Sequence, residues 1–250
     1  MKLKKIFGML ALMTSIFALS VTMVSCGDDD VNGGSDSGNA SAATIVGTYT
    51  AITGSEYQTQ VVFSENGSGV ITETEIDKNR TKVNKTNFTY TVKGNDVTMN
   101  VVNDKYDEPI IYKVSFVDGF ALVEETDGND TELVLYKNGR DLGKPNMSKI
   151  VGTWSYSHKT EYWSEEFTVV INQDGTGKMT DIYKDGSYEE TNEASLLCKM
   201  RNAYIIDVTV TAVGPEGVEI ENGLAAILGG KLYLFDEDGE VDNDDILTKK

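Results

Sequence analysis

The stretch DVTMNVV, residues 96–102, and its counterpart DVTVTAV, residues 207–213, carry the clearest structural signal in this chain. In both stretches apolar side chains alternate with polar ones, which is the two-residue period of a half-buried β-strand. One face of such a strand packs on a core while the other meets water. No long stretch of the chain has the 3.6-residue period of a helix. The sequence therefore predicts an all-β protein.

Further matches on either side of these two stretches form an internal repeat. The segment IVGTY at 45–49 recurs as IVGTW at 150–154, and VVFSENGSG at 61–69 recurs as VVINQDGTG at 169–177. Matches that keep the same order along the chain indicate a duplicated unit. The Asn-Gly and Asp-Gly pairs inside the longer segments are typical of tight hairpin turns, because Asn, Asp and Gly tolerate positive φ.

The repeat divides the chain into consecutive parts. We expect a leader at 1–25, a flexible tether at 26–43, a first β domain at 44–138, a linker at 139–149 and a second β domain at 150–250. Each unit contains about eight short strands, and an antiparallel meander of this length closes most simply into a small barrel. The alignment of the units also predicts a last strand at 246–249. The acidic stretch 236–245 then becomes a hairpin loop rather than a tail.

The first residues have the layout of an export signal. Lys2, Lys4 and Lys5 precede an apolar run, and the small Ser25 stands directly before Cys26. An alternative is a signal anchor that spans the bilayer, with Cys26 as an ordinary thiol.

The end of this leader, Met23-Val24-Ser25-Cys26, resembles a bacterial lipoprotein signal. The resemblance implies acyl chains on Cys26, cleavage before it and attachment to a membrane. The acids that follow, Asp28, Asp29 and Asp30, resemble the export signal of Bacteroidetes-type surface lipoproteins. That resemblance implies the outer membrane of a Gram-negative bacterium and exposure at the cell surface. The alternative for these acids is a solvated charge run within the tether.

The charge and the cysteine content limit the functions that the chain could have. With 40 acidic and 22 basic residues the chain has a formal net charge of −18, which repels phosphate backbones and disfavours nucleic-acid partners. The chain has two cysteines, and acylation of Cys26 leaves Cys198 without a disulfide partner. Because Cys198 stands in an apolar strand-like run, we expect it to be a buried structural thiol.

Both units resemble the lipocalin-like domains of Bacteroidetes-type lipoproteins. The resemblance rests on Gly47-Thr48-Tyr49 and Gly152-Thr153-Trp154, each followed by a strand and a Gly-containing turn. In lipocalins this tryptophan packs across the closed end of the barrel beside a basic residue of the last strand, although neither last strand here has an arginine. The resemblance implies structural barrel-end roles for Trp154 and Tyr49. It also implies a cup for a small apolar ligand, but barrels with short strands are alternatively filled by their own side chains.

The sequence assembles no catalytic centre and predicts no cofactor. A zinc site or a catalytic triad needs several partnered residues, and the only histidine is His158. The carboxylates of 236–245 are of the kind that attracts calcium, yet their spacing is not that of an EF-hand, and a solvated hairpin is the alternative. Trp163 and Tyr162 are the candidate contacts for a ligand or glycan, with packing at the rim as the alternative.

These observations lead to one main hypothesis and two alternatives. We expect a non-enzymatic, lipid-anchored surface lipoprotein whose two domains bind a small apolar ligand, a glycan or a protein partner. The first alternative is a structural or accessory subunit of an envelope complex, with filled barrels. The second is a surface hydrolase whose carboxylates the spacing does not reveal. An interior cavity distinguishes a ligand cup from a filled barrel.

Overall fold

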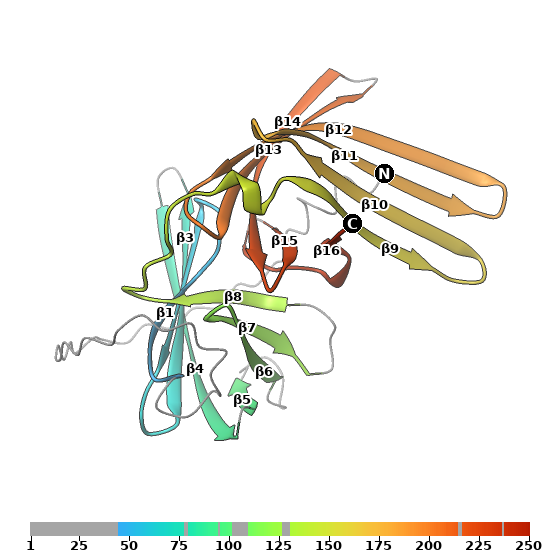
Figure 1. Ribbon diagram of the computed structural model, residues 1–250. Helices are drawn as coiled ribbons and strands as arrows, with labels where there is room; N and C mark the ends of the chain where they lie inside the picture. Colours follow the sequence, from blue (N-terminus) through green and yellow to red (C-terminus); the bar gives the residue numbers. More distant parts are fainter. Residues whose placement is uncertain are drawn as a thin grey trace.

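The protein consists of two closed antiparallel β-barrels in tandem, seen in a computed structural model (Figure 1). The structure describes residues 45–77, 80–94, 96–101, 110–126, 131–214, 217–236 and 238–250. The expected all-β fold with two barrels is confirmed. Cys26, Asp28, Asp29 and Asp30 lie outside the described residues.

The first barrel is built from eight strands in chain order, each paired with the next. They are β1 (Gly47–Ala51), β2 (Tyr57–Phe63), β3 (Ser68–Asp77), β4 (Arg80–Lys93), β5 (Asp96–Val101), β6 (Ile110–Val117), β7 (Phe120–Glu125) and β8 (Thr131–Lys137). The barrel closes where β1 pairs with β8, with Tyr49 opposite Lys137. Closure leaves neither of these strands as an open sheet edge there.

The second barrel repeats this plan with eight further strands. They are β9 (Gly152–Lys159), β10 (Trp163–Ile171), β11 (Thr176–Asp185), β12 (Tyr188–Met200), β13 (Ile205–Gly214), β14 (Gly217–Leu228), β15 (Lys231–Phe235) and β16 (Ile246–Lys249). β16 closes the barrel on β9 through Thr248 opposite Ser155 and Lys249 opposite Trp154. The predicted last strand at 246–249 is therefore present. Two short 3₁₀ turns, η1 (Met147–Lys149) and η2 (Asn243–Asp245), stand outside the sheets.

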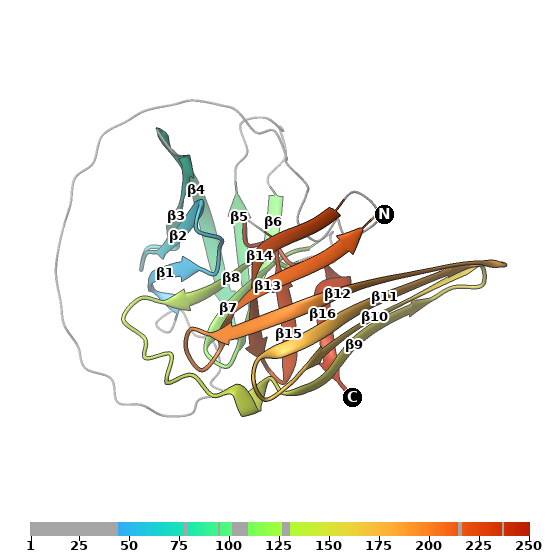
Figure 2. The ribbon, with the colours of Figure 1, turned by 90° about the horizontal axis from the view of Figure 1, so that it is seen from above.

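Several strands are longer than the barrel needs. β12 has 13 residues and β14 has 12, and each runs past the closed part of the barrel before it turns. Figures 1 and 2 show the far halves of β9–β12 leaving the barrel together as a flat sheet, called the arm below, while the β13–β14 hairpin leaves in a different direction. The sequence predicted short strands, and that length fits only the part of these strands that forms the barrel wall.

The two barrels pack directly on each other through outward-facing apolar side chains. Phe120 and Val134 of the first barrel and Ala226 and Leu228 of the second are completely buried in one shared cluster. Complete burial of a side chain such as Phe or Leu is worth about 1.5–3 kcal/mol, so a cluster of this kind holds the barrels together as one body. The repeat in the sequence did not predict this contact, because it records what the units share and not how they meet.

The linker strengthens the same contact. The guanidinium of Arg140 lies 4.7 Å from the centre of the Phe120 ring and 5.5 Å from that of Tyr204, so one cation bridges rings of both barrels. Asp118 accepts a hydrogen bond of 2.7 Å from the backbone of Gly229 across the boundary. The linker thus takes part in the interface rather than running free between two domains.

Candidate functional site

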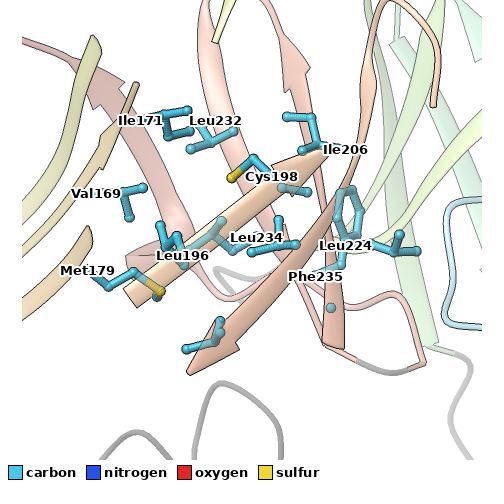
Figure 3. Close-up of a pocket in the computed structure, with 14 residues that line it drawn as sticks. Val169, Ile171, Met179, Leu196, Cys198, Ile206, Leu224, Leu232, Leu234 and Phe235 are labelled. Atoms are coloured by element: carbon cyan, nitrogen blue, oxygen red, sulfur yellow. The ribbon is translucent and has the colours of Figure 1, made fainter. Parts of the chain in front are cut away.

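The interior of the second barrel contains a small apolar cavity of about 30 Å³ (Figure 3). Aliphatic side chains and the thiol of Cys198 point into it from several strands. Ligand pockets measure about 300–1,000 Å³, and water needs polar partners that this lining does not offer. The cavity is a packing gap between core side chains and not a cup for a ligand.

The interior of the first barrel is filled by aromatic rings. The ring of Phe63 has its centre 5.2 Å from that of Phe88, 5.2 Å from that of Tyr90 and 5.6 Å from that of Tyr49, and the planes of all three pairs are close to perpendicular. Edge-to-face contacts of this kind add about 0.5–1.5 kcal/mol per pair to the burial of the rings. Tyr90 also donates a hydrogen bond of 2.6 Å to the carbonyl oxygen of Ser64. The first barrel is therefore packed from within.

Trp154 is buried in the core of the second barrel. Its ring is 1% exposed, and Nε1 donates a hydrogen bond of 2.7 Å to the carbonyl oxygen of Ile150. The ammonium of Lys249, on the last strand, lies 5.3 Å from the ring centre. Lys249 is thus a basic residue of the last strand beside Trp154, as the resemblance to lipocalins implies. Tyr49 occupies the equivalent place in the first barrel, and Lys137 stands opposite it on β8.

On the arm, the candidate contact Trp163 stands in a row of rings. His158 from β9 stacks on it at 4.7 Å with an angle of 26° between the planes, and Tyr183 from β11 flanks it at 6.0 Å and 32°. Because β9 and β11 lie on opposite sides of β10, the two rings approach the indole from opposite sides. The row supports the arm, as cross-strand aromatic pairs do.

The turn that carries Tyr162, the second candidate for a ligand contact, is held by hydrogen bonds. The hydroxyl oxygen of Thr160 accepts hydrogen bonds from the backbone of Tyr162 at 3.2 Å and of Trp163 at 3.0 Å. Tyr162 is 75% exposed at this turn. A contact of Tyr162 or Trp163 with a ligand stays a prediction.

Val241, in the acidic loop that follows β15, packs on the first barrel, whereas Asp242 and Asp244 of the same loop are exposed. Val241 is 1% exposed and exchanges two backbone hydrogen bonds of 2.9 Å with Thr131. Partial burial and the carboxylates of Asp238 and Glu132 raise the pKa of Glu240 to about 7. Among the described residues, no group of three or more His, Cys, Asp or Glu side chains is arranged to hold a metal ion.

A second carboxyl of this loop also has a raised pKa. Burial, followed by the charges of Asp244 and Asp242, raises the pKa of Asp245 to about 8. Neither Asp245 nor Glu240 lines the interior cavity, whose walls are apolar. Burial is the main cause of both raised pKa values, and the neighbouring carboxylates add to it.

The feature that sequence reasoning missed is the outward face of β13 and β14. Val213, Val218 and Ile220 are 79%, 63% and 64% exposed there, although their residue types are usually buried. The alternation of the strand was visible in the sequence, but the length of β14 beyond its neighbour was not. Which apolar positions of this face remain uncovered depends on how far the first barrel extends over the two strands.

Comparison with known proteins adds no assignment. No protein-family model matches the chain, and no curated protein matches it significantly. Within the described part of the chain, no helix has the length and apolar character needed to cross a membrane.

Proposed function

We propose that this chain is a non-enzymatic lipoprotein that acts as a rigid interaction module at the cell surface. Acyl chains on Cys26 anchor it in the outer membrane of a Gram-negative bacterium, and the acids Asp28, Asp29 and Asp30 direct it to the outer face. Its two barrels recognise a protein partner through their outer surfaces rather than holding a small molecule inside.

The observation that supports recognition by the outer surface is the size of the interior space. The cavity of the second barrel measures about 30 Å³, and aromatic rings fill the first barrel. A lipocalin-type cup needs about ten times that volume for even a small ligand. The proposal therefore takes the filled-barrel alternative and assigns recognition to exposed residues.

The joined barrels also suit a module that presents a fixed surface. The shared apolar cluster, the bridging Arg140 and the bond from Gly229 to Asp118 hold both barrels in one orientation. A preorganised surface loses less conformational entropy when it binds. An anchored pair of barrels would present the same face to each partner that it meets.

The anchor is tested in the native host with radiolabelled palmitate, membrane fractionation and protease treatment of intact cells. We expect the wild-type chain to incorporate label, to remain with membranes and to be cut from outside. The variant Cys26→Ala should lose the label and leave the membrane fraction, whereas Cys198→Ala should behave like the wild type. Retention of label by Cys26→Ala contradicts the proposed anchor.

Recognition by the surface is tested against binding in the interior. The full-length protein in detergent is titrated with a fluorescent fatty acid, and photo-crosslinking residues are placed at exposed positions in intact cells. We expect no saturable fatty-acid binding and at least one discrete protein adduct. Saturable binding at one site, abolished when Val210→Phe fills the cavity of the folded protein, would establish a ligand cup and overturn the proposal.

A further inference from the structure

One strand of the second barrel has a long open side. β14 pairs with β13 from Gly217 to Ala226, but with β15 only from Leu224 onward. Within the described residues, 217–223 therefore have a strand neighbour on one side alone. Figures 1 and 2 show this part of the hairpin projecting away from the arm. An unpaired strand edge offers its backbone N–H and C=O groups to another chain.

The outward face of this edge is apolar and uncharged. Val213 stands directly opposite Val218, and Ile220 lies two residues further along β14 on the same face. These side chains are among the most exposed large apolar groups in the described part of the chain. Thr209 and Asn222, joined by a hydrogen bond of 2.9 Å, continue the same face without a charge.

Further along, the same outward face of β13 and β14 carries an interface that already exists, with Thr209, Asn222 and the charged Asp207 in between. Further along the same two strands, Ile205 on β13 and Leu224 and Ala226 on β14 are the outward residues buried against the first barrel. The first barrel covers one end of the outward face and leaves the other end, at Val213, Val218 and Ile220, uncovered. The uncovered end therefore has the composition of an interface without its partner.

The opposite face of the edge is acidic. Glu219 and Glu221 alternate with the apolar residues of β14 and face the other way. A second copy of the chain is a poor occupant. Antiparallel pairing of two β14 edges about Ile220 would set Glu219 of one copy opposite Glu221 of the other, and directly opposed like charges destabilise a sheet. The net charge of −18 adds to this repulsion.

We propose that residues 217–223 of β14 are the docking edge for an extended segment of another protein that adds a strand to the second barrel. The segment alternates aliphatic residues with Lys or Arg. Its aliphatic side chains pack beside Val218 and Ile220, and its cations face Glu219 and Glu221. Backbone hydrogen bonds supply affinity and the alternating side chains supply specificity, as in other cases of strand addition. This inference rests on the proposed function, since it names the surface and the partner chemistry of the interaction module.

The probe is a fluorescein-labelled nine-residue peptide of alternating Lys and Val, titrated into the full-length protein in detergent at low salt. Two controls share its length, one with Glu in place of Lys and one with the same residues in two blocks. We expect fluorescence anisotropy to show saturable binding of the alternating Lys peptide. Binding of the Glu peptide and of the block peptide should be at least tenfold weaker, and rising salt should weaken the binding of the Lys peptide.

Variants locate the binding site. Val218→Thr combined with Ile220→Thr keeps β-branched residues but removes apolar surface, and should weaken binding at least tenfold. The matched control Val170→Thr with Leu197→Thr changes exposed aliphatic residues on fully paired stretches and should bind as the wild type does. Glu219→Lys with Glu221→Lys should reverse the preference toward the Glu peptide. Thermal melting checks that each variant is folded.

Hydrogen exchange provides a readout that does not depend on mutation. Residues 156–159 of β9 and 188–193 of β12 also have a strand neighbour on one side only. We expect the bound peptide to slow amide exchange in 217–223 and to leave these two stretches unchanged. Absence of binding, protection at β9 or β12 instead, or a dimer that Ile220→Lys dissociates would each overturn the inference. The fatty-acid and crosslinking experiments test the proposed function separately from this inference. Crosslinks elsewhere on the barrels would support an interaction module but would not support docking at residues 217–223.

Discussion

Trp154 and Tyr49 show how one position in a repeat is satisfied by two different rings. The indole of Trp154 has a polar N–H that must find an acceptor when buried, and the carbonyl of Ile150 supplies it. Tyr49 makes its contact edge to face with Phe63 instead. Burial, with a smaller contribution from Tyr90, raises the pKa of Tyr49 to about 12, so its hydroxyl stays protonated at neutral pH.

We predict that Trp154→Phe destabilises the protein by about 1–3 kcal/mol, because the carbonyl of Ile150 stays buried without its donor. Urea unfolding followed by circular dichroism measures this difference. Trp163→Phe, on the arm, is the matched control and should change stability by less than about 1 kcal/mol. An equal loss of stability in both variants would show that the hydrogen bond from Trp154 to Ile150 is not its cause.

Cys198 gives a second prediction at the scale of a residue. Burial raises the pKa of its thiol to about 11, so little thiolate exists at pH 8. With Cys26 acylated, we expect the native protein to show no rapidly reacting thiol with a disulfide reagent, and one after unfolding in urea. A thiol that reacts rapidly before unfolding, located by mass spectrometry at Cys198, would show that the interior of the second barrel is open.

At the scale of the element, two glycines allow neighbouring strands to approach closely. Gly69 near the start of β3 and Gly177 near the start of β11 stand at equivalent places in the two units. A Cβ at Gly69 would overlap the Phe88 ring and the carbonyl oxygen of Val62, and one at Gly177 would overlap the carbonyl oxygen of Val170. Backbone atoms cannot turn aside as a side chain can, so both sites exclude larger residues.

We predict that Gly69→Ala and Gly177→Ala each destabilise the protein by about 1–3 kcal/mol through this overlap. Gly214, at the end of β13, has no described atom within 4 Å of the position that an alanine methyl group would take, so Gly214→Ala should be neutral within about 0.5 kcal/mol. Denaturant unfolding of the three variants gives the comparison. Equal effects at Gly69 and Gly214 would mean that lost chain flexibility, rather than close strand packing, sets the outcome.

The arm is an element whose stability comes from its own side chains. It extends beyond the barrel core, and the row formed by His158, Trp163 and Tyr183 supports one of its faces. Exposed ion pairs, Lys184 with Glu189 and Lys178 with Glu193, add little, since such pairs are worth about 0–1 kcal/mol.

At the scale of the whole molecule, the acidic loop makes the stability of the folded protein depend on pH. The carboxyl of Glu240 lies near Asp236, Asp238, Asp242 and Glu132, and its charge also acts on Tyr112 of the first barrel. Its pKa in the folded protein, about 7, exceeds the value of about 4.3 in an unfolded chain. The ionised form is therefore penalised by folding. The penalty is absent below the unfolded pKa, grows as pH rises from there to about 7, and is complete above it.

We predict that the melting temperature falls as pH rises from 5.5 to 8.5, and that Glu240→Gln reduces this fall by a few degrees. The variant should also melt higher than the wild type at pH 8.5, because it removes a charge from a crowded site. Differential scanning calorimetry at several pH values measures both effects. Glu56→Gln, at an exposed turn of the first barrel, is the control, and an identical pH profile for Glu240→Gln and the wild type would contradict the prediction.

Much of the fold was readable from local pattern. Alternation in 96–102 and 207–213 predicted strands, Asn-Gly and Asp-Gly pairs predicted the turns, and the repeat predicted two units with a last strand at 246–249. These features depend on residues close together in the chain, where side-chain period and backbone φ restrict the choices. The closed barrels follow from the number of strands and the need to remove sheet edges.

The exposed face of β14 and the interface between the barrels could not be predicted from local pattern, because both depend on long-range contacts. Whether the outward-facing Val218 and Ile220 are buried or exposed depends on how far the first barrel extends over β14, and their alternation is the same in either case. Likewise Phe120 and Val241 became interface residues because the barrels meet at those places. The amino-acid order was enough to specify which face of each strand is apolar, since alternation is a local property. Which of those faces is covered was settled only in the folded molecule, because burial is set by contacts between segments distant in the chain.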